Sequence, residues 1–131
     1  MRIPEVPDNE AERLAALHAT GLLHTPAEAR FDRITRLARQ LFGVQSAVIS
    51  LVADDYQWFK SRQGLDVCQT SREISFCGHA ILQDSIFLVE DARLDPRFAD
   101  NPLVTGGPCI AFYAAAPLSI ADDQRIGAAQ L

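Results

Sequence analysis

Residues 72–82 read R-E-I-S-F-C-G-H-A-I-L and place a thiol, a glycine and an imidazole at three consecutive positions, 77–79. The side-chain oxygen of Ser75 can accept a hydrogen bond from a free backbone N–H of the next turn, so the stretch predicts a short helix over 76–82. A glycine in a first helical turn costs about 1 kcal/mol relative to alanine, which indicates that backbone, a neighbour or a ligand comes close there. We therefore expect a site here, and not only a core.

The composition predicts one compact domain. The 131 residues are 48% hydrophobic and carry a formal net charge of −5, which is enough apolar content for a core. The acidic balance disfavours binding to nucleic acid or to a membrane surface. No apolar run approaches the roughly 20 residues of a membrane helix, and residues 1–10 lack the apolar region of a signal peptide. Three cysteines, an odd number, predict reduced thiols in a cytoplasmic protein.

Two helices are expected before the first strand. Residues 1–7 contain two prolines and are interpreted as a mobile lead-in, and Asp8 is expected to cap a helix that ends near Ala19. Residues 25–28, T-P-A-E, predict a capping box at the start of a second helix, which Gly43 ends. Its apolar residues recur at helical spacing and predict a helix that covers the core; they are Phe31, Ile34, Leu37, Leu41 and Phe42.

The rest of the chain predicts strands. Residues 46–53, S-A-V-I-S-L-V-A, are apolar on both faces, which is typical of a central strand. Residues 56–64 return after a turn as a half-buried, edge-like strand, followed by a polar connection over 66–72. Three more strands are expected, over 86–91, 109–118 and 125–131, with a turn at 121–124. This order predicts an antiparallel sheet with helices on its faces.

A long connection and a run of small residues predict open space beside that sheet. Residues 92–108 contain three prolines and two adjacent glycines, and are expected to form a binding loop or a flap over a pocket, with a helical turn at 97–103. The next strand contains Ala114, Ala115 and Ala116, which leave room that a helix or a ligand must fill.

Several segments, in this order, resemble the GAF-domain sensors of bacterial signalling proteins. The segments are L-F-G-V-x-x-A-V-I-S-L-V (41–52), Q-W-F-K-S-R-x-G-L (57–65), R-x-I-S-F-C-G-H-A-I (72–81), D-P-R-F-A-D-N-P-L-V-T-G (95–106) and F-Y-A-x-A-P-L (112–118). The resemblance implies an α+β fold: a GAF-like antiparallel sheet of five or six strands, with terminal helices on one face and a short helix plus a long loop over a pocket on the other. It implies an N-terminal lead-in and helix over 1–24 and a GAF domain over 25–131, with the usual closing helix missing.

The resemblance also implies a function. It predicts a non-catalytic, small-molecule-sensing or regulatory domain of a bacterial signal-transduction protein, with no cofactor, homodimeric through its terminal helices, and with its output domain absent from this chain. Two departures concern the pocket, because Ala111 stands where relatives have an arginine and Ala115 where they have a glycine. The ligand is therefore expected to differ from theirs, or to be missing.

The expected ligand-binding residues come from the segments that carry the resemblance. They are Trp58, Phe76, Cys77, His79, Phe98 and Tyr113. The alternative for each is ordinary packing, with Cys77 as a small buried hydrophobic residue. A Cys-x-His pair alone has too few ligands for a metal site, and no nucleotide-binding fingerprint is present. No catalytic residue and no metal ligand are predicted.

Two other functions stay open. The free methionine-R-sulfoxide reductases share the GAF fold and use three cysteines, and Cys68, Cys77 and Cys109 fall at loosely similar places. In that reading Cys109 attacks the sulfoxide, and Cys77 or Cys68 resolves the product to a disulfide. The other alternative is a ligandless dimerisation module, for which a solidly filled interior is expected.

Overall fold

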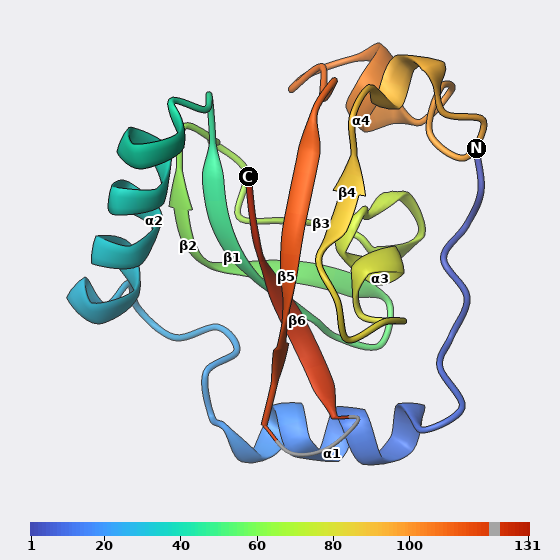
Figure 1. Ribbon diagram of the computed structural model, residues 1–131. Coiled ribbons are helices and arrows are strands. Elements are labelled where there is room, and N and C mark those ends of the chain that lie inside the picture. The colour runs from blue at the N-terminus through green and yellow to red at the C-terminus, as the bar shows by residue number, and fades with distance from the viewer. Residues whose placement is uncertain (121–123) are drawn as a thin grey trace.

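A computed structural model, which describes residues 1–120 and 124–131, contains a six-stranded antiparallel sheet (Figure 1). The strand order is β3-β2-β1-β6-β5-β4. The strands are β1 (Ala47–Val52), β2 (Tyr56–Gln63), β3 (Gln69–Ser71), β4 (Phe87–Val89), β5 (Tyr113–Ser119) and β6 (Arg125–Gln130). The expected fold class, α+β with an antiparallel sheet of five or six strands, is confirmed. The turn predicted over 121–124 falls largely on residues 121–123, which lie outside the described part of the chain.

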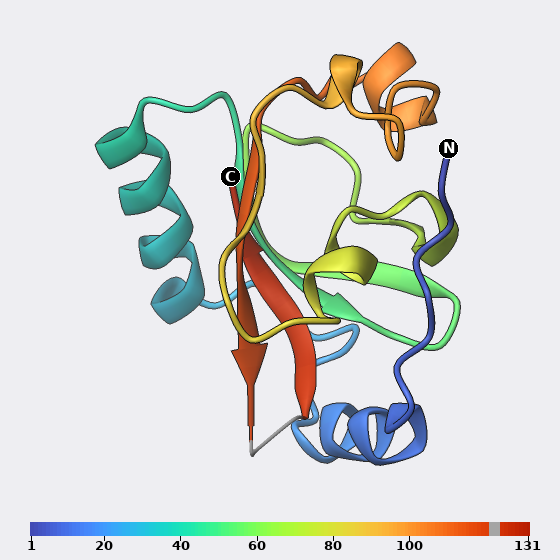
Figure 2. The same cartoon turned by 45° about the vertical axis from the view of Figure 1, so that its right-hand side comes forward.

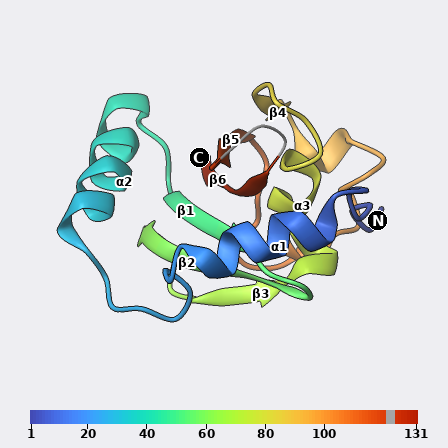
Figure 3. The ribbon, with the colours of Figure 1, turned by 90° about the horizontal axis from the view of Figure 1, so that it is seen from below.

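Helices cover both faces and one end of the sheet. They are α1 (Glu10–Ala19), α2 (Ala29–Phe42), α3 (Cys77–Ala80), α4 (Pro102–Thr105) and two 3-10 turns, η1 (Arg72–Ile74) and η2 (Ala92–Leu94). Figure 2 shows α2 on one face and both α3 and α4 on the other, and Figure 3 shows α1 lying across the lower end of the strands. The short helix and the long loop therefore share one face, as the sequence predicts. None of the described helices is long and apolar enough to span a membrane.

The second strand is not at an edge of the sheet. β2 pairs with β1 on one side and with β3 on the other, from Tyr56↔Ser71 to Trp58↔Gln69. The prediction of a polar connection over 66–72 is wrong in its second half, because Gln69–Ser71 form β3, an edge strand of the sheet. That strand is too short to show an alternation of apolar residues, so its sequence carries no strand signal.

The start of α2 differs from the expected capping box. α2 begins at Ala29, and Glu28 stands at the N-cap without a side-chain capping bond. The buried ammonium of Lys60 takes both predicted capping groups, because its Nζ donates to Thr25 Oγ1 at 2.6 Å and pairs with the Glu28 carboxylate at 2.7 Å. The first helix likewise has Asn9, not Asp8, at its N-cap. Gly43 does end α2, in the left-handed conformation at φ +61°.

The apolar stripe of α2 faces outward, and the expectation that this helix covers the core is wrong. Polar contacts hold the opposite side of the helix on the sheet, where Thr35 Oγ1 lies 2.8 Å from Ser61 Oγ and Ser61 donates to Asp32 at 2.6 Å. Leu37 and Leu41 are in consequence 61% and 72% exposed. Periodicity identifies an amphipathic helix, but it does not say which side contacts the sheet.

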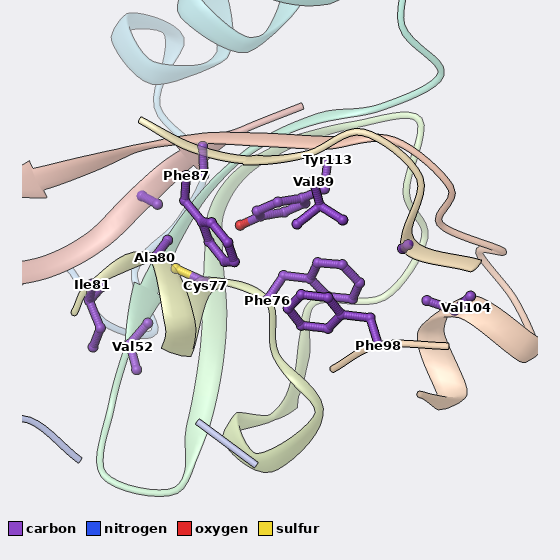
Figure 4. Close-up of a cluster of buried hydrophobic side chains, with 13 residues drawn as sticks. Val52, Phe76, Cys77, Ala80, Ile81, Phe87, Val89, Phe98, Val104 and Tyr113 are labelled. Atoms are coloured by element: carbon purple, nitrogen blue, oxygen red, sulfur yellow. The ribbon is translucent and has the colours of Figure 1, made fainter. Parts of the chain in front are cut away.

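The main core lies between the sheet and the α3–α4 face (Figure 4). Its centre is a stacked pair of rings, Phe76 and Phe98, with centroids 4.1 Å apart and planes inclined by 12°. A second cluster, around Leu17 of α1 and Trp58 of β2, closes the lower end of the sheet. The predicted flap and the Cys-Gly-His turn therefore meet directly, and rings fill the space between them.

The N-terminal residues lie along α3, so the expectation of a mobile lead-in is wrong. The Arg2 N–H donates to the Arg97 carbonyl at 2.9 Å, and His79 Nε2 donates to the Arg2 carbonyl at 3.2 Å. A Cβ added at Gly78 would lie 2.8 Å from Pro4 Cγ. The glycine in the first turn of α3 is thus explained by the close approach of this segment, and Ser75 Oγ accepts the Gly78 N–H at 3.0 Å as predicted.

Candidate functional site

An apolar cavity of about 330 Å³ lies on the α3–α4 face, beside the stacked rings. Strand residues form its floor, and the connection over 64–67 and the segment 108–112 form its sides. Its size falls within the range of roughly 300–1,000 Å³ that is typical of small-molecule sites. The open space that the sequence predicts is therefore present, but it lies past the ring stack and not between α3 and the loop.

The second half of the long loop and the residues after it form one wall of the cavity, because hydrogen bonds hold them in place. Asn101 caps α4 by accepting the Leu103 N–H at 2.9 Å, and its Nδ2 donates to the Ile74 carbonyl of η1 at 3.0 Å. The Ile110 N–H then donates to the Leu103 carbonyl at 2.8 Å. The segment 108–112 is in this way held against α4, where it lines the cavity.

The polar groups of the wall are few and uncharged. Gln57 Nε2 donates to Thr70 Oγ1 at 2.7 Å, and the Tyr113 hydroxyl donates to Gln130 Oε1. Burial raises the pKa of Tyr113 well above its usual value, which keeps the phenol protonated. Among the described residues that line the cavity, none has a charged side chain.

Two of the six expected binding residues line the cavity, namely Phe76 and Tyr113. Phe98 stacks against Phe76 in the core. Trp58 lies in the other apolar cluster, with its ring 5.6 Å from that of His24.

Cys77 and His79 lie apart from the cavity lining. Cys77 is buried and its sulfur accepts a hydrogen bond from Ser50 Oγ at 2.9 Å; burial raises the pKa of this thiol to about 12. His79 stands edge-on to Phe98 at 5.0 Å. Burial, and then the nearby Arg97 guanidinium, lower the pKa of His79 below its usual value, so the ring is neutral at pH 7. A binding role for either residue stays a prediction.

Sequence reasoning missed the polar pair Gln57 and Thr70. The signal for Gln57 was present, because it shares a face of its strand with Phe59 and so places an amide on a buried surface. Thr70 had no comparable signal, since it lies in the strand that was not predicted.

The three cysteines are free thiols in different surroundings. Cys109 lines the cavity and is exposed, Cys77 is in the core, and Cys68 is exposed outside the lining. Within the described part of the chain, no group of three or more His, Cys, Asp or Glu side chains is placed to hold a metal ion.

A charged network connects η1, which precedes the cavity-lining residue Phe76, with α1. Arg72 of η1, four residues before Phe76, pairs with Glu10 of α1 and donates to the Ala53 carbonyl at 3.0 Å. Arg13 holds the same carboxylate, with Nε 2.7 Å from Oε1, and donates to the Val52 carbonyl at 2.7 Å. Burial alone would raise the pKa of Glu10, but the hydrogen bonds from the two guanidinium groups outweigh it and lower the pKa to about 2.

Comparisons with known proteins agree with this architecture. A family model for the GAF domain matches residues 26–131. A cyclic di-GMP phosphodiesterase of Pseudomonas aeruginosa is 44% identical over 127 residues, which are 97% of this chain and 22% of that protein. The chain thus spans about a fifth of the length of that relative.

Solved structures that are similar in fold include the following two. A free methionine-R-sulfoxide reductase from Neisseria meningitidis, solved with its substrate, has a TM-score of 0.61 at 18% identity, over 99% of this chain and 78% of that one. A GAF domain from an Acinetobacter phosphoenolpyruvate-protein phosphotransferase has a TM-score of 0.59 at 14% identity, over 95% and 76%. These identities carry information about the fold alone. The family model, however, covers most of the chain, and the chain belongs to the GAF domain family.

Proposed function

We propose that this chain is a non-catalytic, small-molecule-sensing domain of a cytoplasmic bacterial signal-transduction protein. The observation that carries the proposal is the apolar cavity, whose wall includes Phe76 beside α3 and the fixed segment 108–112. A ligandless module has no need of such a space, which forgoes packing contacts. The similarity to a cyclic di-GMP phosphodiesterase supports a regulatory role within a longer enzyme.

The path from the cavity to α1 is short. Phe76 lines the cavity and follows Ser75, whose hydroxyl donates to the Arg72 carbonyl at 2.8 Å. Arg72 in turn pairs with Glu10 of α1. A ligand that moves Phe76 therefore acts on a segment bonded directly to α1, and differential affinity for two arrangements of that segment would shift the helix.

The test is an NMR titration of the chain with three matched aromatic probes: benzoate, benzylamine and benzamide. We expect at least one probe to shift the amide signals of 108–112 and, at the same saturation, those of α1 at Arg13 and Leu17. The α2 amides at the far face serve as the control. Shifts confined to the cavity would contradict the relay to α1, and no cavity shift with these three probes or with indole would contradict the sensing function.

The reductase alternative is less well supported. At pH 7–8 a thiol with a pKa of about 12 is thiolate in roughly one molecule in 10⁴ or fewer, so Cys77 is a poor resolving group. A sulfenic acid formed on Cys109 would need a second thiol nearby to form the disulfide. Cys68 lies outside the cavity lining, whereas Cys109 is part of it.

We also propose that two copies of the chain associate through α2. The stripe that contains Leu37 and Leu41 is exposed, and beside it lies a groove of about 250 Å³ floored by Ala114, Ala116 and Ala129. A ridge of large side chains next to a groove of small ones is self-complementary under a two-fold axis, because each ridge can fill the groove of the other copy. Contiguous exposed apolar surface of this kind marks protein interfaces.

We expect a homodimer in sedimentation velocity runs at rising protein concentration. The double substitution Leu37→Glu and Leu41→Glu should weaken association by at least about tenfold, because it buries charge in an apolar interface. Leu94→Glu is the matched control, since Leu94 is also exposed and lies in η2, on the face opposite α2. A monomer at every concentration, or a double variant that dimerises like the parent, would contradict this interface.

A further inference from the structure

The residues that line the cavity indicate which kind of molecule it can bind. Four aromatic residues line the same space, namely Phe59 of β2, Phe76 just before α3, Phe112, and Tyr113 of β5. Rings arranged in this way favour an apolar, planar guest, which stacks or meets them edge-on. The cavity is large enough for a one- or two-ring molecule, since an apolar cavity of roughly 150 Å³ already holds benzene.

The charge of the guest follows from the absence of charged side chains among the described residues that line the cavity. No described lining residue has a charged side chain, and Arg72 and Lys60, which lie on neighbouring elements, are already paired with Glu10 and Glu28. Moving an anion or a cation into this space would cost its hydration without a partner charge in return. A phosphate ester or a carboxylate is therefore disfavoured.

One polar group of the wall lacks a partner among the residues that the structure describes. Gln57 is 3% exposed and lines the cavity, and its Oε1 accepts no hydrogen bond within the described residues. Its Nε2 is occupied by Thr70, while Tyr113 and Gln130 bind each other. Buried carbonyl oxygens are nearly always paired, and an unpaired one is costly. Because the terminal torsion of glutamine is soft, a small rotation can present Oε1 to a guest in the cavity.

We infer that the ligand is an uncharged, mainly aromatic small molecule with one N–H or O–H group that donates to Gln57 Oε1. The inference rests on the sensing function proposed above and names the chemical class of the ligand. Gln57 supplies selectivity for the donor, the aromatic rings supply most of the contact, and a wall without charged side chains disfavours ionised analogues.

Three probes with the same ring system test each element of the class: indole, 1-methylindole and indole-3-acetate. Indole is neutral with an N–H donor, 1-methylindole lacks the donor, and indole-3-acetate carries a negative charge. We expect indole to shift the amide signals of Thr70, Cys109 and Ile110 in a saturable NMR titration. 1-Methylindole should bind about tenfold more weakly, and indole-3-acetate should leave these signals unchanged.

Substitution of Gln57 shows whether the discrimination comes from this residue. Two variants are used, Gln57→Leu and the unbranched Gln57→Met. In both, the affinity for indole should fall about tenfold and equal the affinity for 1-methylindole. The affinity for 1-methylindole should be the same in the variants as in the parent. The thermal midpoint of the free variants should change little, because the substitution removes an unpaired carbonyl together with the hydrogen bond to Thr70. Gln63→Leu, on the same strand but outside the lining, is the control and should bind indole like the parent.

Several outcomes would overturn the class. These are equal binding of indole and 1-methylindole, binding of indole-3-acetate in the cavity, or an indole affinity that both Gln57 variants leave unchanged. If benzoate or benzylamine shifts the cavity signals and α1 while indole does not, the sensing function stands and the inferred ligand class is wrong. If no probe of either set reaches the cavity, both are wrong.

Discussion

Replacing Glu10 with glutamine should destabilise the fold by about 3 kcal/mol at neutral pH. The carboxylate lies between two guanidinium groups, those of Arg13 and Arg72, which are themselves almost fully buried. Its removal leaves two buried cations without a counter-charge, and breaking a buried ion pair in this way costs roughly 3–5 kcal/mol. The free energy of unfolding is measured by urea denaturation at pH 7.

The pH dependence of this effect has a definite sign. The pKa of Glu10 is lowered in the folded state from 4.5 to about 2. The stabilisation is therefore fully present above pH 4.5 and is lost as the pH falls toward 2, and the shift corresponds to about 3 kcal/mol. The difference between parent and Glu10→Gln should shrink toward zero over that window. Glu5→Gln, at an exposed pair with Arg2, is the control and should change stability by less than about 0.5 kcal/mol. A gap between parent and Glu10→Gln that does not change with pH would contradict the assignment to this carboxylate.

Truncation of Phe76 to alanine should lower the free energy of unfolding by about 3–5 kcal/mol. Its ring is buried, stacks on Phe98, and packs against Tyr113 at 4.9 Å. Loss of a buried phenyl group and the cavity that remains cost this much in well-packed cores. The measurement is again urea unfolding at neutral pH.

Leu94→Ala is the control for that truncation, because Leu94 is 81% exposed, and it should lie within about 0.5 kcal/mol of the parent. A loss below about 1 kcal/mol in Phe76→Ala would show that the ring stack is not the centre of the core.

The elements predicted well from sequence have strong local signals. β1 consists of apolar and β-branched residues except for Ser50, and Gly43 ends α2 in the left-handed conformation that favours glycine. The elements predicted badly depend on contacts between distant residues. The capping box failed because Lys60, 35 residues from Thr25, binds the same groups, and no local pattern contains that contact.

The orientation of α2 has the same explanation. Its apolar stripe is visible in the sequence. The side of the helix that contacts the sheet is set by the hydrogen bonds of Thr35 and Asp32 with Ser61 of β2. The prediction that residues 1–7 are mobile was wrong because the backbone of Arg2 forms hydrogen bonds with Arg97 and His79, which follow much later in the chain.

The candidate site was predicted only in outline. The face, the long loop, Phe76 and Tyr113 follow from the residues and from the family resemblance. The cavity itself lies farther along the sheet, because Phe98 fills the space next to Phe76. Gln57 was missed because a polar residue on a buried strand face indicates a site only when its partners are known, and its side-chain oxygen has none within the described part of the chain.

The most direct test of the account is to locate a bound probe. In the complex of the chain with indole, we expect intermolecular NOEs from the indole ring protons to the methyl groups of Thr70 and Val48, which line the cavity. NOEs to the methyl groups of Leu37 or Leu41 on α2 instead, or NOEs to neither set under saturating indole, would contradict the claim that this cavity is the sensing site.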